Sequence, residues 1–176
     1  ALVDDSPAYL GTRLAVRRIL HQIALECPAG RRLRVLEVVA GTCTSVQHLL
    51  AEAPDIAFEF VIAQGSDETY SRLCAEYAGH AHVVVAKFGG DGLELSANGP
   101  IPELFDVIVF QHTLHRVAHP VGVIAAARRR LAQAGLLVVA ERHPDVIADF
   151  VFGLDSQWWG SSGGGEAVSR LKALKA

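Results

Sequence analysis

Residues 33–45 read LRVLEVVAGTCTS, a short apolar run followed directly by a turn that contains one glycine. The apolar run over residues 34–39, followed by Ala-Gly-Thr, is typical of a buried parallel strand. Thr44 or Ser45 is then a candidate N-cap for a helix that extends through Ala53. A strand, a glycine-containing turn and a helix in this order open many nucleotide-binding α/β domains. The stretch therefore predicts the first strand–helix unit of such a domain.

The rest of the chain continues this alternation. Apolar runs at 58–63, 82–88, 105–110 and 136–141 predict further strands, and helices are predicted over 6–25, 66–78 and 120–132. Ser66 is a candidate N-cap, Pro120 fits a first helical turn, and Gly135 is expected to end the last helix. Near-continuous apolar strands are typical of sheets covered on both faces. We therefore predict an α/β fold with a mostly parallel sheet.

Composition places the chain among globular domains. Its 176 residues fit one domain, assigned to residues 1–159, followed by a Gly/Ser connector and a short C-terminal helix over 160–176. Apolar residues make up 51% and the net charge is −3, so disorder is not indicated. No basic patch indicates nucleic acid, and no apolar run approaches the roughly 20 residues of a membrane span.

Cysteine usage indicates a reducing compartment. The cysteines, Cys27, Cys43 and Cys74, are far apart and odd in number, which favours neither a zinc site nor a disulfide framework. The cytoplasm is the expected location. Because the chain opens ALVDDSPAYL without Met, we interpret it as a segment of a longer protein.

Four stretches together resemble one family: VLEVVAGTCTSVQHLL, FDVIVFQHTLHRV, LAQAGLLVVAE and DFVFGLDSQWW. They are similar to the C-methyltransferase domains of polyketide synthases, within the class I S-adenosylmethionine (SAM)-dependent methyltransferases. The resemblance covers about residues 30–159. It implies a Rossmann-like fold, SAM as cofactor, a carrier-bound β-ketoacyl substrate, and neighbouring synthase domains and an acyl carrier protein as partners.

The glycine motif departs from that family. The family pattern is close to E-x-G-x-G-x-G, whereas this chain has Glu37, Val39, Gly41 and Cys43 at those positions. Glycine allows a tight turn and close approach to a cofactor. Val39 is β-branched, so it is expected to resist a positive φ and to fill space that the cofactor would use. The resemblance implies that Glu37 and Gly41 remain as cofactor-binding positions.

Two further cofactor contacts are altered. The resemblance implies an acid after the second strand, where it would accept hydrogen bonds from the ribose, but this position holds Gln64. It implies an Asp near the adenine amino group, but this position holds Lys87. Asp67 could replace the first acid, although it fits better as a charge at a helix N-terminus. Asp91 could replace the second if the alignment shifts.

A candidate catalytic pair remains. The resemblance implies that His115 and Glu141 act as the base that deprotonates the activated α-carbon, with Glu141 orienting the imidazole. His112, His119 and His143 crowd the same region and could hold a metal, but their spacing matches no standard ligand set, so solvated loop histidines are favoured. Trp158-Trp159 is interpreted as buried aromatic surface rather than a lid.

Three hypotheses follow from the sequence. The favoured one is a non-catalytic pseudo-methyltransferase domain of a polyketide or fatty-acid-type synthase, with a structural role and no bound cofactor. The alternative is an active C-methyltransferase that uses SAM on carrier-bound β-ketoacyl chains. The third is an isomerase or epimerase that uses His115 and Glu141 without SAM.

Overall fold

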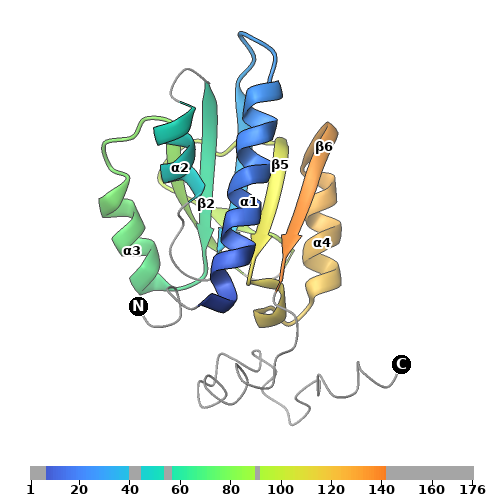
Figure 1. The fold of residues 1–176 in the computed structure, drawn as a ribbon. Helices are drawn as coiled ribbons and strands as arrows, with labels where there is room; N and C mark the ends of the chain where they lie inside the picture. The colour runs from blue at the N-terminus through green and yellow to red at the C-terminus, as the bar shows by residue number, and fades with distance from the viewer. Residues whose placement is uncertain (1–6, 40–44, 54–56, 90–91, 142–176) are drawn as a thin grey trace.

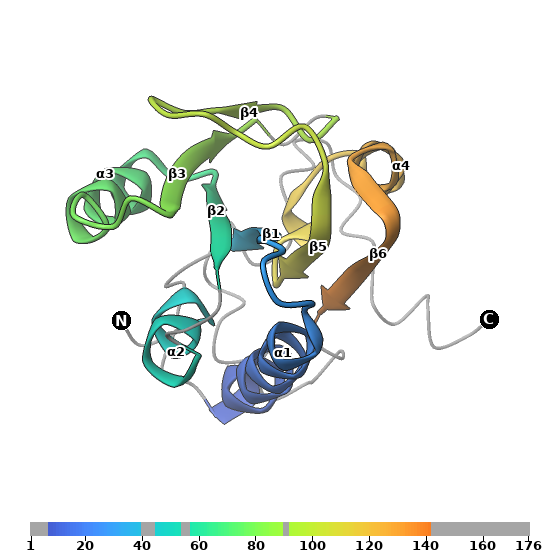
Figure 2. The same ribbon diagram turned by 90° about the horizontal axis from the view of Figure 1, so that it is seen from above.

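The computed structural model describes residues 7–39, 45–53, 57–89 and 92–141. These form a six-stranded sheet in the order β4-β3-β2-β1-β5-β6, with helices on both faces (Figures 1 and 2). The elements are α1 (Pro7–Glu26), β1 (Leu33–Val39), α2 (Ser45–Glu52), β2 (Phe58–Gln64), α3 (Asp67–Glu76), β3 (Val83–Phe88), β4 (Leu95–Ser96), β5 (Phe105–Gln111), the 3-10 turn η1 (Leu114–Arg116), α4 (Pro120–Arg129) and β6 (Leu131–Ala140).

The predicted mostly parallel sheet is confirmed. β1 pairs in parallel with β2 and β5, β2 with β3, and β5 with β6. One apolar cluster joins α1, α2 and α3 to the sheet through Leu20, Leu49 and Leu73. A second cluster joins α4 to the opposite face through Val123 and Ala127. Burial on both faces explains why the central strands lack alternating polar residues.

The structure differs from the prediction at β4 and at the boundary between α4 and β6. The antiparallel strand β4 pairs with the end of β3 and was not predicted, because two residues give no readable pattern. The last helix ends at Arg129, and β6 begins at Leu131 rather than near residue 136. Gly135 lies inside β6, where a Cβ would come within 2.9 Å of the Ala132 carbonyl oxygen. Gly135 is therefore part of an irregular strand, where the backbone leaves no room for a Cβ, and it does not end a helix.

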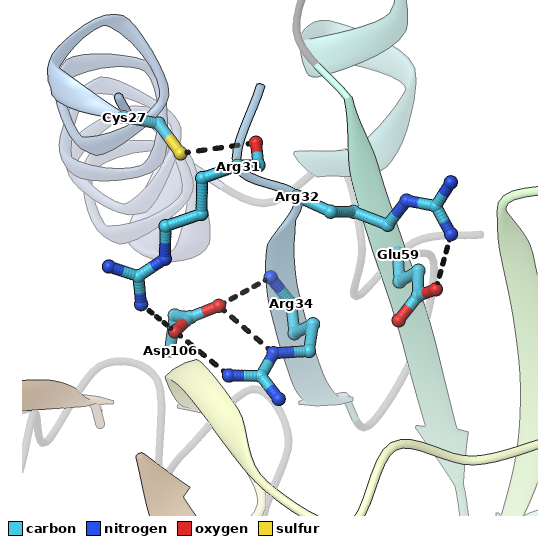
Figure 3. Close-up of polar contacts among 6 residues, drawn as sticks. All are labelled: Cys27, Arg31, Arg32, Arg34, Glu59 and Asp106. Atoms are coloured by element: carbon cyan, nitrogen blue, oxygen red, sulfur yellow. Dashed lines mark hydrogen bonds and ion pairs between the residues drawn. The ribbon is translucent and has the colours of Figure 1, made fainter. Parts of the chain in front are cut away.

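Ionic contacts at the amino ends of the strands fix β1 against β5 (Figure 3). Asp106 is buried, and its Oδ2 accepts a hydrogen bond from the Arg34 backbone N–H at 2.9 Å. The guanidinium groups of Arg31 and Arg34 also contact this carboxylate. Burial alone would raise the pKa of Asp106, but these donors outweigh it and the pKa is lowered. The carboxyl ends of β1 and β5 lie at the opposite edge of the sheet.

Asp106→Ala is expected to lower the free energy of unfolding by about 2 kcal/mol, because the Arg34 backbone N–H loses its acceptor. Urea denaturation of both proteins measures the difference. Glu59→Ala is the matched control, since it removes a more exposed ion pair with Arg32 and should cost less than about 1 kcal/mol. Equal losses in the two variants would contradict the assigned role of Asp106.

None of the helices in the described residues combines the length and apolar character needed to cross a bilayer.

Candidate cofactor and proton-transfer site

Three residues that depart from the family motif form one row across the sheet. Val39 pairs with Gln64 on β2, and Gln64 pairs with Lys87 on β3. On its other side Val39 pairs with Gln111 at the end of β5. Ligands of open parallel sheets bind at the carboxyl ends of the strands. The register therefore brings Val39, Gln64 and Lys87 together at the edge where a nucleotide would be expected.

Val39 is accommodated in a way that the sequence did not indicate. It continues β1 as extended backbone and does not have a positive φ, so the expected backbone conflict does not arise. Its side chain is 3% exposed and packs in the cluster beneath α1 and α2. The valine thus extends the apolar core to the end of the strand. Gly41 and Cys43 lie outside the described residues.

Glu37 connects β1 to α2. The carboxylate is fully buried, and its Oε1 accepts a hydrogen bond from the Ser45 hydroxyl at 2.9 Å. Ser45 is the first residue of α2 and is itself buried. The hydrogen bond from Ser45 thus gives Glu37 a structural role, because it holds the start of α2 against β1. Its prediction as a cofactor-binding residue stays a prediction.

Gln64 is buried, and its amide oxygen is engaged in the turn that follows β2. Its Oε1 accepts a hydrogen bond from the Ser66 backbone N–H at 3.1 Å. The Ser66 hydroxyl in turn accepts from the Thr69 N–H, which confirms the predicted N-cap of α3. The oxygen that would have to accept a ribose hydroxyl is therefore already a turn acceptor.

Lys87 forms an ion pair that sequence reasoning missed. Its Nζ lies 2.6 Å from Asp67 Oδ1 in the first turn of α3, and 5.3 Å from the centre of the Tyr70 ring. The hydrogen bond and charge of Asp67 raise the pKa of Lys87. Asp67, proposed as a substitute ribose acceptor, is thus bonded to the cation at the adenine position. Asp91 lies outside the described residues.

The structure brings His115 and Glu141 together beyond the ends of β5 and β6. His115 Nδ1 lies 2.8 Å from Glu141 Oε2, and both side chains are partly buried. Glu141 Oε1 accepts hydrogen bonds from the backbone N–H groups of Thr113 and Leu114, at 2.9 and 2.7 Å. Burial would raise the pKa of Glu141, but His115 and the two backbone donors lower it overall. The carboxylate is therefore ionised at neutral pH.

The contact with Glu141 selects one tautomer of neutral His115. Because Glu141 is an acceptor, Nδ1 of the neutral imidazole carries the proton and Nε2 carries the basic lone pair. Such a carboxylate–imidazole pair can act as a general base. The Arg116 Nε lies 3.4 Å from His115 Nε2, on the side where a substrate proton would have to approach. The pair is thus intact in geometry, with a cationic neighbour at its basic nitrogen.

His112 is not the solvated loop residue that the sequence favoured. It is 6% exposed and adopts a φ of 55°, a conformation that histidine tolerates better than most residues. Its backbone N–H donates to the Ala140 carbonyl, and its Nε2 lies 2.8 Å from the Thr12 hydroxyl on α1. His112 therefore links α1 to the ends of β5 and β6.

The remaining histidines and tryptophans selected from the sequence add no residue to the described site. His119 is exposed, as expected, and precedes α4, whereas His143 and Trp158-Trp159 lie outside the described residues. In the ranges that the structure describes, no group of three or more His, Cys, Asp or Glu side chains is arranged to hold a metal ion.

No protein-family model matches the chain. Among curated proteins, it is 25% identical over 159 residues to the hybrid PKS-NRPS synthetase iccA of Talaromyces variabilis, covering 89% of this chain and 4% of that protein. It is 27% identical over 175 residues to polyketide synthase ThaG of Burkholderia thailandensis, covering 93% and 3% respectively. The chain thus spans a small fraction of these synthases.

Solved structures share the fold. The citrinin polyketide synthase CMeT domain superimposes with a TM-score of 0.73 at 22% identity, over 97% of this chain and 45% of that one. The CurJ carbon methyltransferase gives 0.70 at 20% identity, over 92% and 43%. The trans-methyltransferase CalH, solved with S-adenosylhomocysteine (SAH), gives 0.65 at 23% identity, over 88% and 44%. The chain therefore has the Rossmann-like fold of the class I methyltransferases, and it resembles the C-methyltransferase domains of polyketide synthases.

Proposed function

We propose that this chain is a methyltransferase-like domain of a polyketide synthase that no longer transfers methyl groups and has a structural role. The observation that carries the proposal is the in-register row of Val39, Gln64 and Lys87. The family resemblance implies a glycine and two carboxylates at these positions. This chain has a valine, an amide and a cation there instead.

These residues fit SAM poorly. Gln64 carries no negative charge, and one of the two lone pairs of its Oε1 already accepts the Ser66 N–H, so the paired acceptors that a carboxylate offers a ribose are lost. Lys87 is a donor and cannot accept a hydrogen bond from the adenine amino group. A hydrogen bond to a charged group contributes about 1.5–3 kcal/mol, so two losses weaken binding by about a hundredfold or more. A domain that cannot hold its methyl donor cannot transfer the methyl group.

Exposed apolar side chains support a structural role. Leu10, Leu14 and Leu25 lie on one side of α1 at helical spacing and are 53, 43 and 59% exposed. Apolar side chains that share one side of an exposed helix are typical of a surface that packs on another domain. We infer that this side of α1 contacts a neighbouring domain of the same synthase, in the cytoplasm, and that an acyl carrier protein visits the assembly. No cofactor is required for this role.

The contact between His115 and Glu141 favours one alternative, an active C-methyltransferase. When bound, SAM would supply the methyl group. The residues of this chain would do the remaining work: His115 Nε2 would remove the α-proton of a carrier-bound β-ketoacyl thioester, and Glu141 would stabilise the imidazolium that forms. A glutamate can equally hold the 113–115 backbone in place, so the contact alone does not demand catalysis.

We expect no methylated product when the chain is incubated with a β-ketoacyl carrier protein and excess SAM. Mass spectrometry of the acyl chain measures the outcome. His115→Ala is the matched control, since the proposal predicts the same background in both proteins. A methylated product that disappears in His115→Ala would overturn the proposal and support the active alternative.

A further inference from the structure

The strand β3 has an open edge. On one side it pairs in parallel with β2, and on the other side β4 pairs only with its last two residues, Lys87 and Phe88. Within the described part of the chain, no strand covers the stretch from Val83 to Ala86 on that side. Figure 2 shows β3 beside α3 and β4 at this end of the sheet. An edge of this kind presents backbone donors and acceptors that can pair with another strand.

The register of β2 and β3 decides which backbone groups face the open edge. The His82 carbonyl oxygen accepts a hydrogen bond from the Phe60 N–H at 2.8 Å, so the His82 carbonyl faces β2. Backbone groups alternate in direction along a strand, so those of Val83 and Val85 face away from β2. The Val83 N–H donates to the His80 carbonyl oxygen. The Val83 carbonyl and both backbone groups of Val85 are thus directed towards the position of an added strand.

The open edge forms the floor of a groove with a volume of about 420 Å³. One wall belongs to α3 and the turn after it, and the other belongs to the segment that follows β4. The walls include Tyr70, Cys74 and Tyr77 on the first side and Asn98, Gly99 and Pro100 on the second. Among the described residues that line the groove, none is an Asp, Glu, Lys or Arg. The groove therefore suits uncharged side chains, because a buried charge would find no counter-ion there.

We propose that this groove binds an extended peptide segment of another polypeptide, which adds to the sheet as a strand beside β3. Main-chain hydrogen bonds to Val83 and Val85 supply the affinity in this mode of recognition. Side chains alternate along an extended segment, so one set meets the aromatic wall of α3 and the other set meets the wall at Gly99. The matching segment alternates apolar side chains with small polar ones. The proposal does not depend on the loss of methyl transfer.

A linear segment fits this edge better than a second folded copy of the chain. β3 has six residues and β4 pairs with two of them, so four stay open. These four span about 13 Å at about 3.3 Å per residue. Stable complexes of folded proteins bury about 1,200–2,000 Å², which so short an edge between two walls does not provide. A single strand fits between the walls, because it lies only about 4.8 Å from the strand with which it pairs.

Alkylation of Cys74 by iodoacetamide, followed by mass spectrometry of each cysteine, measures occupation of the groove. The probe is a short peptide of alternating valine and threonine with a lysine at each end. At ten times the dissociation constant, we expect the peptide to slow the alkylation of Cys74 about tenfold. Cys27 is the internal control, because it lies after α1, outside the groove lining, and its Sγ contacts the Arg31 carbonyl. Its rate should not change.

Two controls separate strand addition from general protection. The same peptide methylated on every backbone nitrogen keeps its side chains but has no donors, so it should not protect Cys74. Gly99→Leu adds a side chain to the groove wall, and its Cβ would make an ordinary contact of 3.7 Å with a Val84 methyl group, so we expect the variant to fold. It should bind the peptide at least tenfold more weakly. Gly11→Leu is the matched control, because this exposed position has open space around it, and it should behave like the unchanged protein.

Failure of the peptide to protect Cys74 in the unchanged protein would overturn the proposal. Equal protection by the methylated peptide would show that the groove binds side chains without strand pairing, and equal affinity in Gly99→Leu would place the peptide elsewhere; either result contradicts the proposal. Protection of Cys74 that rises with protein concentration in the absence of peptide would identify a second copy as the occupant, which would also contradict it.

Discussion

Glu141→Ala is expected to lower the free energy of unfolding by about 2–3 kcal/mol. The carboxylate accepts hydrogen bonds from His115 Nδ1 and from the backbone N–H groups of Thr113 and Leu114. Removing it leaves these partly buried donors without their acceptor at the point where β5 passes into η1. Urea denaturation at neutral pH measures the loss. The prediction treats Glu141 as a structural residue, whatever its part in proton transfer.

The chain contains a suitable control for this substitution. Glu52 pairs with His48 at 3.6 Å on α2, and its side chain is 55% exposed. Glu52→Ala removes the same type of pair without the backbone donors and should cost less than about 0.5 kcal/mol. If Glu141→Ala were no more destabilising than Glu52→Ala, the structural role assigned to Glu141 would be wrong.

The same carboxylate predicts a pH dependence. The pKa of Glu141 is lowered in the folded protein, so the folded state favours the ionised form. This stabilisation is fully present above the unfolded pKa of about 4.3 and is lost as the pH falls through the lower folded pKa. Glu141→Gln should therefore flatten the acid side of the stability profile below about pH 4.3. An unchanged slope in Glu141→Gln would contradict the lowered pKa.

Restoring two carboxylates is expected to increase the affinity for SAH at least tenfold. The double variant Gln64→Glu/Lys87→Asp replaces an engaged amide and a cation in one row of the sheet. Each regained hydrogen bond to a charged group contributes about 1.5–3 kcal/mol, and about 1.4 kcal/mol corresponds to a tenfold change in affinity. Val39 remains in the core of this variant, so we expect partial and not full recovery.

Lys87→Ala serves as the control for this experiment. It removes the ion pair with Asp67 but adds no acceptor, so it should bind SAH no better than the unchanged protein. If Lys87→Ala gained as much affinity as the double variant, release of the ion pair and not the restored carboxylates would explain the gain. If neither variant gained affinity, Val39 or the 40–44 segment would have to be the dominant obstacle.

The sequence predicted the parts of the fold that depend on local pattern. The apolar runs of β1, β2, β3 and β5 and the Ser66 cap were predicted because burial on both faces and capping leave clear signals. β4 was missed because it is too short to show a period. The start of β6 was misplaced because Gly135 is a general breaker, and only the approach of the Ala132 and Phe105 carbonyl oxygens reveals its role inside a strand.

At the site, the family resemblance identified which positions depart from the motif, but not which residues they contact. It selected Val39, Gln64 and Lys87, and the strand register then showed that these residues lie side by side. The ion pair between Lys87 and Asp67 joins β3 to α3, so no sequence period could predict it. The burial of His112 likewise depends on the packing of α1 across the sheet, which a loop position in the sequence does not indicate.

Calorimetric titration of the unchanged chain with SAH tests directly whether the nucleoside end of the site still binds the cofactor. We expect no saturable heat at micromolar ligand, with a measurable response only in Gln64→Glu/Lys87→Asp. Saturable micromolar binding by the unchanged chain would contradict the proposed loss of the SAM site. Such a result would show that Gln64 and Lys87 accommodate the nucleoside as they stand.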